Sequence, residues 1–219
     1  MNFLTFEILK IKDVSISLHW TWTVAMMFVA YLDLNMFLYI LPIYFFVLLH
    51  ELGHVFAAKS LNIEARSIHL FPFGGLARII FPEKQNSKKE FLITIAGPLV
   101  NLGLLIIFAL CQLITPEKYL ILNHFILVNL VLFVFNLLPL FPMDGGRILR
   151  CVLHFLMKDY HKATKWAVRI GQVLSIALCI VAFSQGFIML CAITILVILG
   201  GEMELRSLDQ KVSDSTHLE

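Results

Sequence analysis

The sequence predicts an all-α polytopic membrane protein with about six transmembrane helices and a small membrane-associated β-hairpin after the second helix. Hydrophobic residues make up 59% of the 219 residues and charged residues only 15%. The mean hydropathy of +0.86 is far above that of a soluble domain. Apolar stretches that could supply the roughly 20 helical residues needed to cross a bilayer recur along the whole chain, so a cleaved signal peptide does not account for them.

Six apolar segments are expected to cross the membrane. They cover residues 16–34, 37–60, 89–114, 119–157, 165–184 and 186–203. The fourth segment is too long for one regular crossing. It contains Pro139 and Pro142, followed by Gly145 and Gly146, and these residues predict that its helix breaks near the middle.

The basic residues predict the orientation of the chain. Lys and Arg accumulate on the cytoplasmic side of membranes, and with six crossings all seventeen except Lys118 fall on one side. A multi-pass protein of the cell membrane with both termini in the cytoplasm is therefore expected. Residues 1–207 are expected to form one integral-membrane domain, and residues 208–219 a polar cytoplasmic tail. The formal charge of +2 gives no case for a nucleic-acid partner.

Residues 63–81 differ from the apolar segments on either side. Ile, Leu, Phe and Arg alternate there at strand-like spacing around Gly74 and Gly75, which favours a short hairpin. The stretch is too apolar for a fully solvated loop, so we expect it to dip back towards the bilayer, where irregular backbone must lie against protein or a wet cavity. A plain connecting hairpin with no role is the alternative.

The motif from His50 to His54 reads His-Glu-Leu-Gly-His and lies inside the second apolar segment. Four residues make nearly one helical turn, so both imidazoles project from one face, about 6 Å apart along the axis, as two ligands of a tetrahedral zinc would. Glu51 lies close enough to act on water at the metal. A hydrogen-bonded network without metal is the alternative. Two His and a Glu in a membrane-crossing helix cost several kcal/mol unless something satisfies them, so chance is a poor explanation for the motif here.

A catalytic zinc normally has three protein ligands, and Asp144 is the best candidate for the third. It lies in the broken fourth segment, where the prolines free backbone carbonyls and the glycines let main chain approach closely. The alternative role for Asp144 is a helix cap. The rival carboxylate, Asp33, lies near the end of the first segment and is expected to be a boundary residue.

These motifs together resemble the site-2 proteases, the intramembrane zinc proteases that cut membrane-bound regulators. HExxH corresponds to His50–His54, GxxxN to Gly97–Asn101, and NxxPxxPxDGG to Asn136–Gly146. Pro72-Phe73-Gly74-Gly75 resembles the membrane-associated hairpin of the family. Met143 stands where the family often has Leu before the aspartate, which affects no catalytic group. The chain looks like the compact branch without a PDZ domain, similar to sporulation-type and archaeal members.

The resemblance implies one zinc ion per chain, Glu51 as the catalytic base, and cleavage of a membrane protein or membrane-bound precursor in regulated intramembrane proteolysis. The active site is expected nearer the cytoplasmic face. The residues expected to bind substrate are Asn136, Asn101, Gly97, Phe73, Gly74 and Gly75. For Asn136 and Asn101, ordinary interhelical hydrogen bonding is the alternative. A regulatory membrane partner or a homo-oligomer is left open.

A non-enzymatic membrane protein is the competing class, either a metal transporter or a pseudoprotease that only binds clients. Transporters place several ionisable groups along a path, whereas the groups here converge on one three-ligand site. A pseudoprotease would be expected to lack Glu51, which is present. The sequence therefore favours a zinc metalloprotease.

Overall fold

The computed structural model describes residues 5–11, 13–81, 86–115 and 119–216. The chain divides into two compact units, residues 1–134 and 135–219. The first contains β1 (Thr5–Ile11), β2 (Val14–His19), α1 (Trp20–Leu32), α2 (Leu34–Ser60), β3 (Glu64–Phe71), β4 (Gly74–Ile80), α3 (Ser87–Ile114) and most of α4 (Leu120–Leu137). The second contains α5 (Asp144–Met157), α6 (Tyr160–Ser184) and α7 (Ile188–Thr216).

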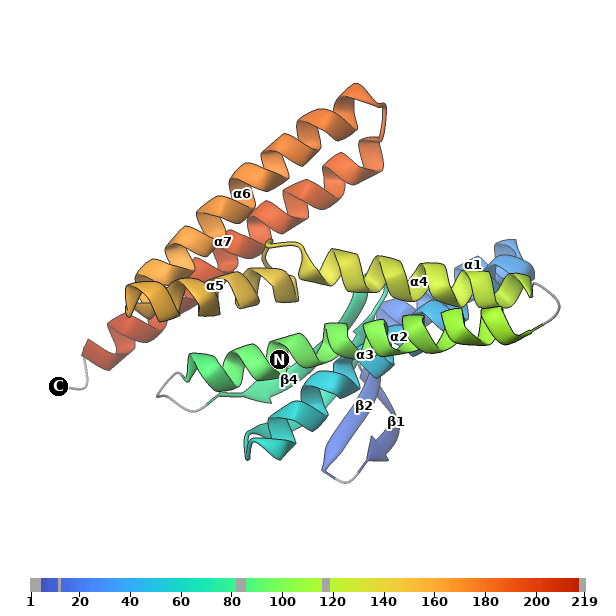
Figure 1. Ribbon diagram of the computed structural model, residues 1–219, viewed down its shortest axis with the longest axis horizontal. Coiled ribbons are helices and arrows are strands. Elements are labelled where there is room, and N and C mark those ends of the chain that lie inside the picture. Colours follow the sequence, from blue (N-terminus) through green and yellow to red (C-terminus); the bar gives the residue numbers. More distant parts are fainter. Residues whose placement is uncertain (1–4, 12, 82–85, 116–118, 217–219) are drawn as a thin grey trace. The chain divides into compact units, whose positions relative to one another are not determined.

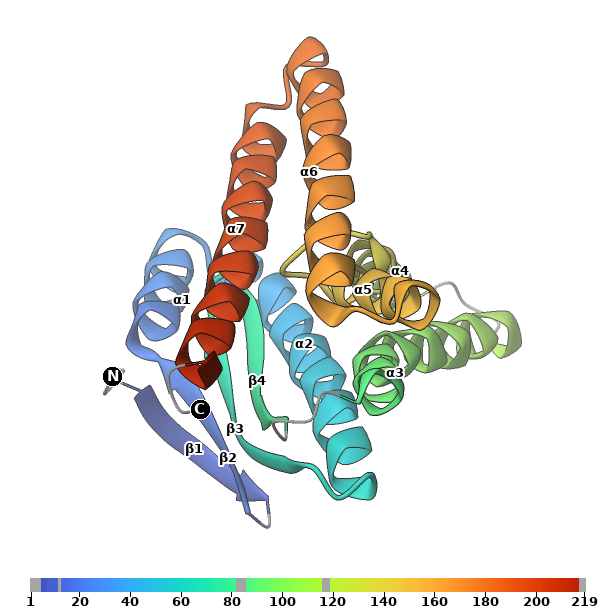
Figure 2. The same ribbon diagram turned by 90° about the vertical axis from the view of Figure 1, so that its left-hand side faces the viewer.

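The four strands of the first unit form one sheet (Figure 1), in the order β1-β2-β3-β4 (Figure 2). Strands β1 and β2 pair antiparallel, β2 and β3 parallel, and β3 and β4 antiparallel. Period-2 alternation explains the buried face of β2, because Val14 and Ile16 are each only 2% exposed. Among the described residues, β4 pairs with β3 alone, so it forms one edge of this sheet.

The core of the first unit lies where this sheet meets α2 and α3. Ile68 of β3 is fully buried and packs in one cluster with Val55 and Ala58 of α2 and Ile93 of α3. Strands β3 and β4 both contact α2 (Figure 2). The hydroxyl of Tyr44 also donates a hydrogen bond of 2.6 Å to the carbonyl of Pro72 in the hairpin turn. The β3–β4 hairpin is therefore fastened to α2.

The second unit is a helical assembly in which α6 and α7 lie side by side (Figure 1). Arg150 of α5 is 5% exposed and forms an ion pair with Glu204 of α7. Its guanidinium carbon also lies 5.2 Å from the ring centroid of Phe141 and 5.0 Å from that of Tyr160. The buried cation is thus satisfied by both a carboxylate and aromatic faces.

The expected break in the fourth apolar segment is confirmed. Helix α4 ends at Leu137 and α5 begins at Asp144. A Cβ on Gly145 would lie 2.1 Å from the carbonyl oxygen of Leu138, and one on Gly146 would lie 2.8 Å from that of Leu140. Because those neighbours are backbone atoms, they cannot move aside as a side chain could. Glycine is required for the first turn of α5 to pack on the preceding chain.

The hairpin expected at residues 63–81 is confirmed as β3 and β4. The fold is mostly helical, as expected, but its sheet is larger than the expected hairpin because β1 and β2 extend it to four strands. The expected first span, residues 16–34, begins instead within β2. Ser15 and Ser17 alternate there with apolar residues, a period-2 pattern that favours a strand over a helix. Helix α1, which follows, has only 13 residues.

Among the described residues, four helices are long and apolar enough to cross a membrane: α2, α3, α4 and α6. The expected number of six spans is therefore not confirmed. Helix α7 begins close to the expected sixth segment but continues to Thr216, through most of the stretch expected to be a tail. Lys118, on which part of the orientation argument depends, lies outside the described residues, as do residues 217–219.

Candidate metal centre

Two histidines of α2 form a buried pair of imidazoles. His50 and His54 are 4% and 7% exposed. The Nδ1–H of His54 donates to the carbonyl of Ile93 at 2.8 Å, and Nδ1 of His50 lies 2.6 Å from Oδ1 of Asn101. Both acceptors are oxygens, so in each ring the proton is on Nδ1 and Nε2 carries the lone pair.

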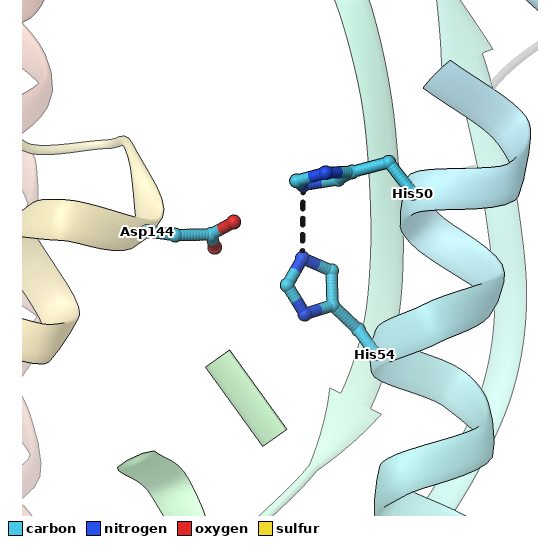
Figure 3. Close-up of side chains that lie close together, drawn as sticks. All are labelled: His50, His54 and Asp144. Carbon is cyan, nitrogen blue, oxygen red and sulfur yellow. Dashed lines mark hydrogen bonds between the residues drawn. The ribbon is translucent and has the colours of Figure 1, made fainter. Parts of the chain in front are cut away.

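The two Nε2 atoms face one another at 3.1 Å (Figure 3). Two zinc–nitrogen bonds of about 2.05 Å at a tetrahedral angle would hold their nitrogens about 3.3 Å apart. Two lone pairs at this spacing repel each other unless a cation or a proton lies between them. The pair is therefore well suited to bind one metal ion through both Nε2 atoms.

The backbone of α3 approaches these imidazoles closely at Gly97. A Cβ at this position would lie 2.3 Å from Nε2 of His54 and 2.8 Å from Cε1 of His50. Gly53 makes the matching approach from α2, where a Cβ would lie 2.9 Å from the carbonyl oxygen of Ala96. The absence of side chains at both positions gives the two rings the space they occupy.

Glu51 is half-buried and turns towards β4. Its Oε2 accepts a hydrogen bond of 2.9 Å from the backbone N–H of Ala77. A Cβ on Gly75 would lie 2.6 Å from Cγ of Glu51, so glycine there leaves room for the carboxylate. Ala77 was not among the candidates from sequence, because nothing in its type or spacing marks a backbone donor.

Asp144 is the first residue of α5 and is 9% exposed. The two imidazoles of His50 and His54 and the carboxylate of Asp144 are the donor types found together in catalytic zinc sites. The rival carboxylate, Asp33, instead caps α2 by accepting a hydrogen bond of 2.8 Å from the backbone N–H of Asn35. This confirms its expected place at a segment boundary.

The remaining candidates from sequence lie in different surroundings. Phe73 is 96% exposed in the hairpin turn, and Gly74 beside it has a φ of +145°, which favours glycine. Asn136 lies in the last turn of α4 and is partly exposed. Asn101 is fully buried, and its two polar atoms contact His50 and Asn129.

Comparisons with known proteins agree on one family. The profile of peptidase family M50 matches residues 38–121 and 116–178. The chain is 35% identical over 214 residues to zinc metalloprotease MJ0392 of Methanocaldococcus jannaschii. The aligned region covers 94% of this chain and 62% of that protein. It is 37% identical over 107 residues to stage IV sporulation protein FB of Bacillus subtilis, covering 47% of this chain and 36% of the relative.

A solved structure also has this fold. The site-2 protease from Methanocaldococcus jannaschii matches with a TM-score of 0.67 and 32% identity, over 92% of this chain and 95% of the solved chain. The chain spans less than two thirds of the length of the two curated relatives.

The close approach of Gly97 to both imidazoles generates a prediction. Gly97→Ala should weaken zinc binding roughly tenfold or more, because its methyl group would displace the rings. Zinc affinity is measured on detergent-purified protein by competition with a chromophoric chelator. Gly103→Ala is the matched control, since it lies in the same helix and its Cβ would meet nothing within 4 Å. Equal zinc affinities of the two variants would contradict the assignment.

Proposed function

The chain belongs to peptidase family M50, and from this we propose that it is an intramembrane zinc metalloendopeptidase. It cleaves membrane-spanning or membrane-associated proteins within or near the bilayer. The observation that carries the proposal is the pair of Nε2 atoms 3.1 Å apart on an apolar helix, with Glu51 next to His50. A soluble HExxH motif would not need so apolar a helix.

His50, His54 and Asp144 hold the zinc ion in this proposal. When bound, zinc polarises the scissile carbonyl and lowers the pKa of water to about 7. The donor chemistry supports this ligand set, because both rings present Nε2 lone pairs and a carboxylate is the usual third ligand of His-rich protease sites. Residues 1–207 then act as one protease domain, since the ligands come from both compact units.

Glu51 acts as the general base and then the general acid. Its carboxylate takes the proton of the attacking water and delivers it to the leaving amine. The hydrogen bond from Ala77 N–H to Oε2 orients the carboxylate, and Oε1 remains on the side of Gly75. The proposal thus gives β4 a role in positioning the base.

Glu51→Gln separates a protease from a metal transporter. The amide keeps the shape of the side chain but accepts no proton, so cleavage should fall by roughly 100-fold or more, while zinc affinity stays within a few fold. Cleavage of single-span membrane proteins by detergent-purified protein is measured with and without a zinc chelator. Unchanged, chelator-insensitive cleavage would overturn the proposal, and metal flux in proteoliposomes that survives the substitution would favour a transporter.

The role of Asp144 has its own test. Asp144→Asn removes the charge of the proposed third ligand and should weaken zinc binding by at least about tenfold. Asp159→Asn is the control, because that carboxylate in the same unit caps α6, where it accepts a hydrogen bond of 3.0 Å from the backbone N–H of Lys162 and forms an ion pair with the Lys162 side chain. Zinc content and affinity are compared for the two variants. Wild-type affinity in Asp144→Asn would remove Asp144 from the ligand set.

The substrate is proposed to bind as an added strand at the edge of β4. A transmembrane helix hides its peptide bonds in its own hydrogen bonds, so it must unwind before attack. The backbone N–H of Ala77 points away from β3, and by strand alternation those of Gly75 and Ile79 do too. Phe73 and Gly74 at the turn, and the amide of Asn136, are the proposed contacts near the scissile bond.

Proline at the β4 edge tests strand addition. Ile79→Pro removes an outward N–H and should raise KM several-fold, because the substrate loses one backbone hydrogen bond. Ile79→Ala is the matched control, since it also loses the packed Ile side chain but keeps the N–H. Cleavage kinetics of a single-span substrate are measured for both. Identical KM values in the two variants would eliminate strand addition at this edge.

The proposed depth of the site in the membrane rests on the position of His50 along α2. His50 lies ten residues before the end of α2 at Ser60, so at 1.5 Å per residue the metal would lie roughly 10 to 15 Å from that end of the helix. Lys59 and the basic residues of the hairpin support a cytoplasmic position for this end. We propose cytoplasmic termini, with water reaching the site from the cytoplasm.

A further inference from the structure

A line of buried side-chain amides connects α4 to the metal ligand His50. Asn101 of α3 places Oδ1 2.6 Å from Nδ1 of His50 and donates its Nδ2 to Oδ1 of Asn129 at 3.1 Å. Nδ2 of Asn129 donates in turn to the carbonyl of Phe125 at 2.9 Å. Asn101 and Asn129 are both 0% exposed, so water does not compete for these hydrogen bonds.

The far end of this line fixes the direction of every hydrogen bond in it. A backbone carbonyl can only accept, so Asn129 must direct its NH₂ towards Phe125 and its Oδ1 towards Asn101. Asn101 then must direct its NH₂ towards Asn129 and its Oδ1 towards His50. An oxygen next to Nδ1 requires the proton on Nδ1 and leaves the lone pair on Nε2, the nitrogen that faces His54.

The reversed arrangement would disable the ligand. If the amide of Asn101 turned by 180°, its NH₂ would face Nδ1 of His50, and that nitrogen would have to accept. The ring proton would then lie on Nε2, which could no longer bind a metal. Asn101 by itself has no preference between its two orientations, so the choice rests on the residue behind it.

We propose that Asn129 is a positioning residue for the metal site, which acts through Asn101 to hold His50 in its metal-binding tautomer. The inference rests on the proposed zinc function and gives Asn101 this orienting role in place of the substrate contact expected from sequence. His54 needs no such device, because its acceptor is the carbonyl of Ile93. This relay, from Asn129 through Asn101 to His50, therefore serves only one of the two histidine ligands.

A double-mutant cycle on zinc affinity tests the relay. Asn129→Leu removes the acceptor for Asn101 at similar volume and should weaken zinc binding by roughly 10- to 100-fold, the range for partners that orient a ligand. Asn101→Asp offers an oxygen to His50 in either orientation of the carboxylate, so in this background the acceptor of His50 no longer depends on Asn129. In the Asn101→Asp background, Asn129→Leu should then cause no further loss of zinc affinity.

This rescue distinguishes orientation from packing. If Asn129 only filled space, its replacement would cost the same affinity in both backgrounds, and that result would overturn the proposal. Wild-type affinity in the single Asn129→Leu variant would overturn it as well. Zinc affinity is measured by chelator competition, and the absorption spectrum of the cobalt-substituted protein reports whether the ligand set changes, both in detergent and without reference to cleavage.

Thr164→Val is the matched control for loss of a buried hydrogen bond. Thr164 is 0% exposed and donates to the carbonyl of Tyr160 at 2.8 Å, within α6, so its replacement should leave zinc affinity unchanged. Thermal unfolding of each variant shows that it is folded. A wild-type chain that binds no zinc would overturn the proposed function itself, whereas a zinc-binding chain with additive substitutions would overturn only the relay.

Discussion

The hydrogen bonds that α3 accepts from the two imidazoles of α2 are the interactions on which the site depends. An imidazole N–H in an apolar helix costs several kcal/mol unless it finds an acceptor. Asn101 supplies one acceptor and the carbonyl of Ile93 supplies the other. Both hydrogen bonds use Nδ1. The contacts that satisfy the ring N–H groups therefore also turn the two Nε2 atoms towards each other.

This arrangement requires α2 and α3 to approach more closely than ordinary side chains permit. Gly53 on one helix and Gly97 on the other remove the Cβ atoms that would meet backbone or imidazole at 2.3 to 2.9 Å. Small residues at helix contacts are typical of membrane proteins, where close packing replaces the hydrophobic effect as the force between helices. The glycines of the two motifs are therefore spatial requirements of the histidines.

Features encoded by local chain chemistry could be predicted from sequence. Spacing by four placed His50 and His54 on one face, and prolines with glycines marked the break before Asp144. The β3–β4 hairpin followed from alternation around Gly74. Strand β2 was missed because its parallel partner, β3, lies some fifty residues further along the chain, and hydropathy alone merged it with the apolar helix that follows.

The contacts of Glu51 and Asn101 could not be read from local pattern, because each partner comes from a different element. Ala77 contributes a backbone N–H, which no residue type reveals. Asn129 did leave a signal, since an amide between Val128 and Leu130 in an apolar helix needs a partner. What the sequence lacked was the pairing itself, which requires α3 and α4 to be placed together.

The two histidines differ in what holds them. The acceptor of His54 is part of the main chain at Ile93, so no substitution at that position can remove it. The acceptor of His50 is a side chain, itself oriented by another side chain. The hydrogen bond of one imidazole therefore does not depend on side-chain identity in α3, whereas that of the other depends on two buried amides. If both rings bind the proposed metal, substitutions at these two amides would change the basicity of one ligand, and so its metal preference, without altering the HExxH motif.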